Sequence, residues 1–245
     1  MNKVKEHYEQ LCSEYGDINE HLPTLCRYAM ECDSIFETGI RGCVSSWALA
    51  YGLLNGIRQN QTEKRMLLND KIECDIDEFV KAMSMENIKI SWIWENNLTL
   101  DLEESFDLTF IDTWHVYGQL KRELEKFSKI TKKYIIMHDT TVDEWEGETL
   151  RLHFDAVQQS IDSGIPIDEI NKGLWPAIDE FLKKNPEWMI KERFSNNNGL
   201  TILSKTSLIK DTTGWDPHDS RLEEENEDIA AGKGDRGVWS EHHLK

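Results

Sequence analysis

One stretch of this chain, residues 35–46, constrains its fold more than any other. It reads IFETGIRGCVSS, so an apolar run ends in Glu37 and is followed by Gly39, Gly42 and small residues. We interpret it as a buried strand, an acidic residue, a glycine turn and the start of a helix. Glycine lets a backbone loop approach a ligand closely, and the first turn of a helix offers free N–H groups to it. The stretch therefore predicts a site for a nucleotide-like ligand at the end of a strand.

Two later apolar runs also end in an aspartate. They are FIDTWH at 110–115 and YIIMHD at 134–139. Strands that alternate with helices are typical of a mostly parallel sheet with helices on both faces. The expected strands are 34–38, 65–69, 88–94, 107–111 and 133–137, and the expected helices between them are 45–54, 75–85 and 117–130.

Acidic residues follow every one of these expected strands. Parallel strands present their carboxyl ends at one edge of the sheet, where ligands of such folds bind. Core packing does not explain five carboxylates along that edge, so we expect a ligand site there. The five residues are Glu37, Asp70, Glu95, Asp112 and Asp139.

The chain divides into three parts by its pattern. Residues 1–33 predict an N-terminal helical cap, because apolar residues from Leu22 to Ala29 recur at helical spacing. Residues 34–210 predict the sheet domain, and residues 211–245 an acidic, flexible tail. At the end of the sheet domain we expect a helix at 174–184 and an antiparallel hairpin of strands 188–194 and 199–204.

Composition excludes several classes of function. The chain has 245 residues, enough for one substantial core, and 28 Lys and Arg against 46 Asp and Glu give a net charge of −18. That charge disfavours nucleic acid as a partner. We expect no membrane span and no signal peptide, because long apolar runs are missing. Five cysteines without a CxxC pair predict reduced thiols and a cytoplasmic protein.

Several motifs together carry a resemblance to a known family. They are ETGIRG at 37–42 with Ser45 and Ser46, IDTWHVY at 111–117, HDT at 138–140, and the segments 173–182 and 198–200. With these motifs the chain resembles the class I S-adenosylmethionine-dependent methyltransferases over about residues 22–204. More narrowly, it is similar to the branch that contains sugar and macrolide O-methyltransferases and cephalosporin-hydroxylase-like proteins. The resemblance implies a Rossmann-like α/β fold, with a mostly parallel seven-stranded sheet that ends in the antiparallel hairpin.

The resemblance also implies a set of cofactor-binding residues. Asp70 would accept hydrogen bonds from the ribose hydroxyls, since a carboxylate can take two donors at once. The alternatives are an ordinary strand-to-helix turn for the glycines, and a solvated or helix-capping acid for Asp70. The implied set is Glu37, Gly39, Gly42 and Ser45 around the glycine turn, Asn69 and Asp70 at the ribose, Glu95 and Asn96 near the adenine, and Asp112.

In the metal-dependent members of this group, carboxylates after the fourth and fifth strands bind a divalent cation. Asp112 and Asp139 match those positions, and we expect Mg²⁺, which prefers oxygen ligands. The sugar enzymes tend to carry a glutamate where this chain has His138, which departs from the pattern. Three alternatives follow. His138 is a third ligand; or Asp143, Glu144 or Thr140 completes the shell; or no metal binds and His138 holds Asp139 or takes part in proton transfer.

Asp112 and His115 are the expected catalytic residues. A histidine three residues after the aspartate acts as general base in the resembling sugar enzymes, and its pKa suits that task. Alternatively, His115 caps the following helix or packs beneath Trp114. Trp114, Trp145 and Trp175 are candidates for stacking on a sugar, although ordinary packing explains each one separately.

The first hypothesis is an S-adenosylmethionine-dependent O-methyltransferase that acts on a sugar or glycan hydroxyl. A cephalosporin-hydroxylase-like protein with an oxygenase partner is the second. A nicotinamide-dependent oxidoreductase is disfavoured, because Glu37 stands where the first glycine of G-x-G-x-x-G belongs. A binding protein that assembles through its acidic tail is the fourth. A homodimer is the expected oligomeric state from base rates alone.

Overall fold

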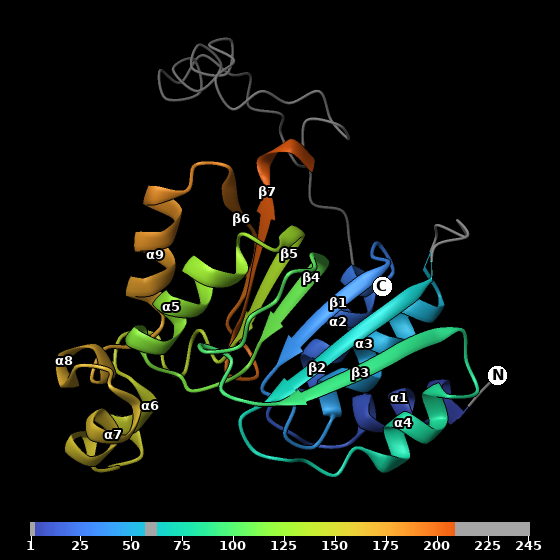
Figure 1. Cartoon of the computed structure of the whole chain (residues 1–245), viewed down its shortest axis with the longest axis horizontal. Helices are drawn as coiled ribbons and strands as arrows, with labels where there is room; N and C mark the ends of the chain where they lie inside the picture. Colours follow the sequence, from blue (N-terminus) through green and yellow to red (C-terminus); the bar gives the residue numbers. More distant parts are fainter. Residues whose placement is uncertain (1–2, 57–62, 209–245) are drawn as a thin grey trace, which may run out of the picture. The chain divides into compact units, whose positions relative to one another are not determined.

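The computed structural model describes residues 3–56 and 63–208, and its compact unit ends at Thr206 (Figure 1). The acidic tail expected at 211–245 lies outside the described residues. Within the described residues, no helix is both long and apolar enough to cross a membrane. The five cysteines are unpaired.

A seven-stranded sheet forms the centre of the molecule (Figure 1). The strands lie in the order β3-β2-β1-β4-β5-β7-β6, and β7 runs antiparallel to both β5 and β6. This confirms the predicted Rossmann-like sheet with its antiparallel hairpin. The strands are β1 (Ser34–Thr38), β2 (Lys64–Asp70), β3 (Ile88–Trp94), β4 (Phe106–Ile111), β5 (Thr131–His138), β6 (Trp188–Phe194) and β7 (Leu200–Lys205).

Helices cover both faces of this sheet (Figure 1). α5 and α9 pack together on one face, and α1, α2, α3 and α4 lie on the other. The helices are α1 (Lys3–Ser13), η1 (Asn19–His21, a 3₁₀ turn), α2 (Leu22–Ala29), α3 (Val44–Leu54), α4 (Asp77–Met83), α5 (Tyr117–Phe127), α6 (Glu148–Arg151), α7 (Ala156–Ser163), α8 (Ile167–Ile170) and α9 (Trp175–Lys184).

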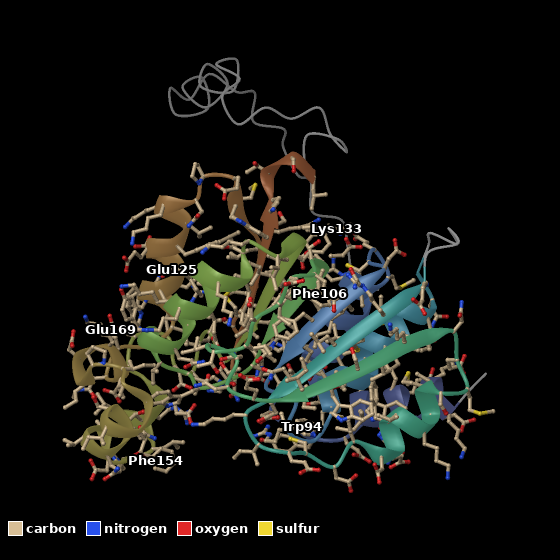
Figure 2. The ribbon with its side chains drawn as sticks, viewed as in Figure 1. Trp94, Phe106, Glu125, Lys133, Phe154 and Glu169 are labelled. Atoms are coloured by element: carbon tan, nitrogen blue, oxygen red, sulfur yellow. The ribbon has the colours of Figure 1, made fainter. Side chains whose placement is uncertain are left out.

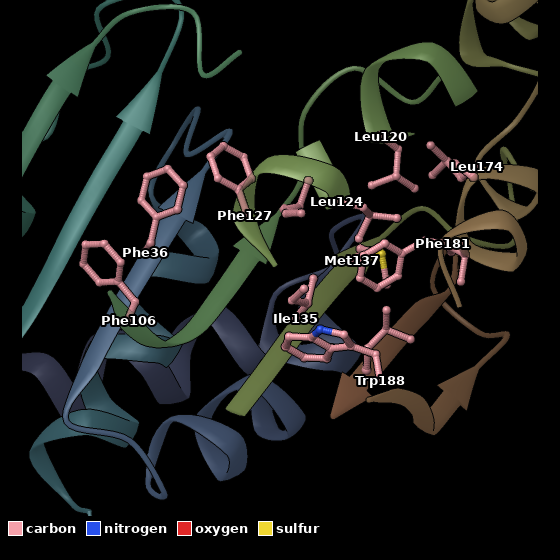
Figure 3. Close-up of a cluster of buried hydrophobic side chains, with 14 of the residues drawn as sticks. Phe36, Phe106, Leu120, Leu124, Phe127, Ile135, Met137, Leu174, Phe181 and Trp188 are labelled. Atoms are coloured by element: carbon pink, nitrogen blue, oxygen red, sulfur yellow. The ribbon is translucent and has the colours of Figure 1, made fainter. Parts of the chain in front are cut away.

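One hydrophobic core cluster lies between the sheet and the helices α5 and α9 (Figure 3). Phe36 of β1 packs on Phe127 of α5 with ring centroids 5.0 Å apart. Phe181 of α9 and Trp188 of β6 close the far end of the same cluster. Burial of such aromatic side chains contributes about 2–3 kcal/mol each, so this core fixes the sheet against its helices.

The strand register places the carboxyl ends of the five parallel strands β1 to β5 at one edge. Thr38 pairs with Ile111 of β4 and with Asn69 of β2, and Ile111 pairs with Met137 of β5. The end of β3, marked by Trp94 in Figure 2, belongs to this edge, whereas Phe106 marks the opposite edge at the start of β4. The residues that follow the strands therefore share one rim, as the sequence predicted.

Some expected element boundaries were wrong. β2 and β5 are longer than predicted, and the helix expected at 75–85 is confined to 77–83. The helix expected at 117–130 ends at Phe127. Residues 1–33 are not helical throughout, because residues 14–18 separate α1 from η1. These ends differ because fraying and capping of a helix depend on tertiary contacts that a periodic pattern does not contain.

The three short helices α6, α7 and α8 were not predicted at all. α7 buries none of its residues, and Val157 and Ile161 on it are 56% and 71% exposed. Phe154, between α6 and α7, is also half exposed (Figure 2). α7 therefore lacks the buried apolar face that makes a helix recognisable in a sequence, and α6 and α8 have only four residues each.

Gly39 allows the loop after β1 to lie directly against the end of β4. Its φ angle is +87°, and a Cβ atom at this position would stand 1.8 Å from the carbonyl oxygen of Asp112. Gly42 differs, because a Cβ atom there would meet no atom within 4 Å. Only the first of these two glycines is required by the fold itself.

We predict that Gly39→Ala lowers the free energy of unfolding by at least about 2 kcal/mol, because backbone strain and a steric clash act together. Gly42→Ala is the matched control and should change it by no more than about 0.5 kcal/mol. Urea denaturation of the cofactor-free protein measures both values. Equal losses in the two variants would contradict this interpretation of the loop.

Candidate active site

The site lies along the rim where β3, β2, β1, β4 and β5 end. In that order across the sheet, the predicted acids are Glu95, Asp70, Glu37, Asp112 and Asp139. The structure brings Glu37 and Asp112 to adjacent strand ends, since β1 and β4 are neighbours. A glycine loop borders one half of the rim, and a cluster of carboxylates and imidazoles borders the other.

Glu37 is fully buried beneath the glycine loop. Its Oε1 accepts a hydrogen bond of 2.5 Å from the Ser45 hydroxyl at the start of α3. Its Oε2 is buried and has no hydrogen-bond partner among residues 3–56 and 63–208. Burial raises the pKa of Glu37 to about 7, against the opposing effect of the Ser45 hydroxyl. An unpartnered buried acceptor at this position fits a hydrogen-bond donor on a ligand.

Asp70 ties the glycine loop to the end of β2. Its Oδ2 accepts from the backbone N–H of Arg41 at 3.1 Å, and its Oδ1 accepts from that of Ile72 at 3.1 Å. The side chain is partly exposed. Each carboxylate oxygen keeps a second lone pair, so Asp70 can still accept hydrogen bonds from ligand hydroxyls.

Asn69 does not present its side chain to a ligand. Its Nδ2 donates to the carbonyl oxygens of Ile93 and Glu95 at 2.9 Å each, and its Oδ1 accepts from the Thr38 hydroxyl at 2.8 Å. The residue is 1% exposed. The amide group therefore joins the ends of three strands, with both hydrogens directed to the end of β3 and Oδ1 bonded to β1. This corrects the expectation that the Asn69 side chain shares the ribose role of Asp70.

Glu95 and Asn96 lie just beyond β3, beside Asp70. The N–H of Glu95 donates to the Asp70 carbonyl at 2.9 Å, and the Glu95 side chain is exposed. Asn96 folds its own loop, because its Oδ1 accepts from the N–H of Leu98 at 3.0 Å. The two residues form the outer wall of the rim next to β2.

The imidazole of His115 stands among four carboxylates. Its Nε2 lies 3.2 Å from Asp112 Oδ1 and 3.1 Å from Asp139 Oδ2. Its Nδ1 lies 3.0 Å from Glu148 Oε2 and 3.2 Å from Asp143 Oδ2. Burial opposes the charged ring, but these carboxylates outweigh it and raise the pKa of His115 well above its usual value. The surroundings of His115 thus favour its protonated, positively charged form.

The second imidazole, His138, has its orientation fixed by the backbone. Its Nε2 lies 3.1 Å from the carbonyl oxygen of Asn197, which can only accept, so Nε2 carries a hydrogen. Its Nδ1 faces Asp139 Oδ2 at 3.1 Å and Asp112 Oδ2 at 3.6 Å. Burial disfavours the charged ring, but the two aspartates raise the pKa of His138 to about 10. The two carboxylates therefore stabilise a positive charge next to Nδ1, which either a proton or a metal ion can supply.

The end of β5 turns sharply to complete this arrangement. Asp139 has a φ angle of +56°, a left-handed conformation that aspartate tolerates better than most residues. Thr140, one of the alternative ligands, pairs with the Thr201 hydroxyl at 2.9 Å and is buried. Glu144, another alternative, forms an ion pair of 2.9 Å with Arg193. Both side chains thus already have protein partners, and the alternative that either one completes a metal shell stays a prediction.

Two functional side chains were missed by sequence reasoning, Glu148 and Arg151. Both lie on α6, in the segment whose helices were not predicted. Arg151 binds Asp143 through two bonds, of 2.5 Å from Nε and 2.8 Å from Nη2. No motif in the sequence pointed to either residue, because their role depends on where α6 is placed.

Among the described residues, two groups of three side chains have metal-ligand geometry, with ligand atoms within 4.8 Å of one another. One is Asp112, His138 and Asp139, which matches the predicted metal ligands; the other is His115, Asp139 and Asp143. Asp143 already binds a guanidinium, so the first group is the better cation site. Its donor set of two carboxylates and one imidazole, whose Nδ1 faces both carboxylates, fits a divalent metal.

The chain matches no protein-family model and no curated protein sequence. Solved structures do resemble it. A Podospora anserina methyltransferase, PaMTH1, bound to S-adenosylhomocysteine, is 14% identical, has a TM-score of 0.52, and covers 84% of this chain and 89% of its own. An O-methyltransferase from Bacillus cereus in complex with S-adenosylhomocysteine is 15% identical, with a TM-score of 0.52 and coverage of 84% and 92%.

A third similar structure is TomG, a Streptomyces achromogenes O-methyltransferase involved in tomaymycin synthesis, in complex with S-adenosylmethionine. It is 12% identical, has a TM-score of 0.50, and covers 84% of this chain and 91% of its own. The seven-stranded sheet, parallel except for β7, agrees with this likeness. The chain has the fold of the class I S-adenosylmethionine-dependent methyltransferases.

Proposed function

We propose that the chain is an S-adenosylmethionine-dependent O-methyltransferase whose acceptor is a hydroxyl of a sugar or glycan. One observation carries the proposal. The glycine loop with Glu37 and the cluster around Asp112 lie at adjacent strand ends, and Gly39 lies against the Asp112 carbonyl. A methyl donor bound at the glycine loop and an alcohol bound at the Asp112 cluster would lie close together, as an in-line displacement requires.

The cofactor would bind along the ends of β1 and β2. Glu37 Oε2 would accept a hydrogen bond from the cofactor, and Asp70 would accept from its ribose hydroxyls. The open space beside Gly42 leaves room for the cofactor against the loop. Asn69 would support this surface from below by joining β1, β2 and β3.

Asp112, His138 and Asp139 would hold a divalent cation. When bound, the cation would polarise the acceptor hydroxyl and lower its pKa. The two carboxylates suit Mg²⁺ or Mn²⁺, and the imidazole shifts the preference towards Mn²⁺ or another first-row transition ion. Charge supports the assignment, because among the described residues the four carboxylates of the cluster outnumber two guanidinium groups. Arg151 binds Asp143, and Arg41 interacts electrostatically with Asp112 and Asp139.

His115 would accept the proton of the acceptor hydroxyl at Nε2. When bound, the cofactor would supply a sulfonium methyl group to the oxygen that His115 deprotonates, with the new carbon–oxygen bond replacing the carbon–sulfur bond and S-adenosylhomocysteine as the leaving group. Without added positive charge, the surrounding carboxylates keep His115 protonated. A cation at the neighbouring ligands would lower the pKa of His115 by repulsion, so its role as a base belongs to the metal-loaded site.

Trp145 supports a sugar as acceptor. It is 65% exposed, and its backbone carbonyl accepts from Gly173 N–H, which anchors the loop that carries it. Its indole face is therefore available for stacking on a sugar ring. Trp175 is less suitable, because the Arg193 guanidinium lies 3.8 Å from the centre of its ring. Trp114 is only partly exposed.

Isothermal titration with S-adenosylhomocysteine tests the cofactor site. We expect binding by the wild type and at least about tenfold weaker binding by Gly42→Ala, because the added methyl group would enter the space of the cofactor. Trp145→Ala is the control and should bind the ligand as the wild type does. A folded wild type that does not bind S-adenosylhomocysteine would refute the proposed function.

Methyl transfer to a panel of sugar acceptors tests the metal site. We expect Asp112→Asn and Asp139→Asn to lower turnover at least about 100-fold while S-adenosylhomocysteine binding persists. Asp179→Asn, on the surface of α9, should have no effect. A chelator should inactivate the wild type, and Mg²⁺ or Mn²⁺ should restore it. Full turnover in excess chelator would exclude the metal.

The buried carboxyl of Glu37 predicts a pH dependence of stability. Its pKa of about 7 in the folded chain lies above the ordinary value of 4.5, so folded protein retains a proton that unfolded protein releases between these values. The free energy of unfolding should therefore fall as pH rises from about 4.5 to about 7, by up to about 3 kcal/mol.

Glu37→Gln should abolish this contribution. In urea denaturation of the cofactor-free protein, the variant should gain stability over the wild type as the pH rises through this window, and the difference should be constant above it. Glu95→Gln, an exposed position on the same rim, should follow the wild-type curve. Parallel curves for Glu37→Gln and the wild type would contradict the assignment.

A further inference from the structure

The turn between β6 and β7 reaches back to the metal-ligand cluster. Asn197, Asn198 and Gly199 have positive φ angles of 44°, 69° and 97°. This left-handed path, which asparagine and glycine adopt most readily, places the Asn197 carbonyl 3.1 Å from His138 Nε2. Within the described chain, the hydrogen-bond partner of His138 Nε2 is therefore a backbone carbonyl of the turn and not a side chain.

The side chain of Asn197 anchors the same residue to the N-terminal segment. Its Nδ2 donates to the carbonyl of Gly16 at 2.9 Å, and its Oδ1 accepts from the N–H of Glu20 at 3.0 Å. Both partners lie close to η1, more than 170 residues earlier in the chain. The position of the Asn197 carbonyl thus depends on two hydrogen bonds made by its own side chain.

The neighbouring contacts strengthen this connection. His21 of η1 is 1% exposed, and its Nε2 lies 2.9 Å from the Asn196 carbonyl. The His21 ring meets the His138 ring edge to face, with centroids 5.7 Å apart. The His138 ring is therefore held on one side by the turn and on another by η1.

We propose that Asn197 is a positioning residue that orients His138 and so sets the affinity of Asp112, His138 and Asp139 for a divalent cation. The inference rests on the proposed metal site. A hydrogen bond to Nε2 turns the ring so that Nδ1 points at the two carboxylates. Partners of this kind, on the far nitrogen of a metal-binding histidine, typically change metal affinity 10–100-fold when they are lost.

The chain contains a matched pair of variants for the test. Asn197→Gly keeps the left-handed backbone and removes both anchoring bonds. Asn198→Gly makes the same change at the next position, whose side chain forms no hydrogen bond with the described part of the chain. Titration with Mn²⁺, followed by the loss of its free electron paramagnetic resonance signal, measures affinity. We expect the affinity for Mn²⁺ to fall about tenfold or more in Asn197→Gly and to stay unchanged in Asn198→Gly.

A second measurement reports the orientation of the ring itself. The hydrogen on His138 Nε2 should give a proton resonance that is protected from exchange with water, identified by its absence in His138→Gln. We expect this signal in the metal-free wild type and in Asn198→Gly, and its loss in Asn197→Gly. A residue that only stabilised the fold would alter the unfolding midpoint without this selective loss.

The outcomes separate this inference from the proposed function. Wild-type Mn²⁺ affinity and a protected signal in folded Asn197→Gly would overturn it. A wild type that binds S-adenosylhomocysteine but no Mn²⁺ would overturn it together with the metal assignment, and would leave the cofactor site intact. If Asn197→Gly does not fold, Asn197→Asp replaces it. That variant removes only the bond to Gly16, and the expected losses are the same in direction and smaller.

Discussion

The contact between Gly39 and the Asp112 carbonyl is the constraint on which the rest of the site depends. It exists because β1 and β4 are parallel neighbours in register and because residue 39 has no side chain. This contact joins the surface proposed for the methyl donor to the cluster proposed to activate the alcohol. Any side chain at residue 39 would separate the two, even if every polar residue of the rim were retained.

Excess negative charge dominates the second half of the site. Asp112, Asp139, Asp143 and Glu148 surround the imidazole of His115, and one guanidinium binds Asp143. Four carboxylates at such distances repel one another unless positive charge is supplied. In the metal-free chain, protons on the two histidines supply it, as the raised pKa values of His115 and His138 indicate. A divalent cation would serve the same purpose and would free His115 to act as a base.

Residues far apart in the chain hold this cluster in place. The N-terminal segment around η1 contacts the turn at Asn197, and that turn contacts His138. On the other side of the rim, Asn69 joins the ends of three strands by its amide group. Side chains of this kind bind no ligand in the proposed mechanism. They convert a loose set of polar groups into a site of fixed geometry, which catalysis requires.

The sequence by itself determined the sheet and most of its rim. Buried parallel strands are continuous apolar runs, and Glu37, Asp112 and Asp139 stand directly at the ends of such runs, so local pattern was sufficient to bring them together. Tertiary structure alone decided the roles of Glu148, Arg151, Asn69 and Asn197. The helix that carries the first two has no buried apolar periodicity, and the amides of the other two could have faced either a ligand or the protein. Hydrogen-bond partners distant in sequence settle that choice, and no local pattern records them.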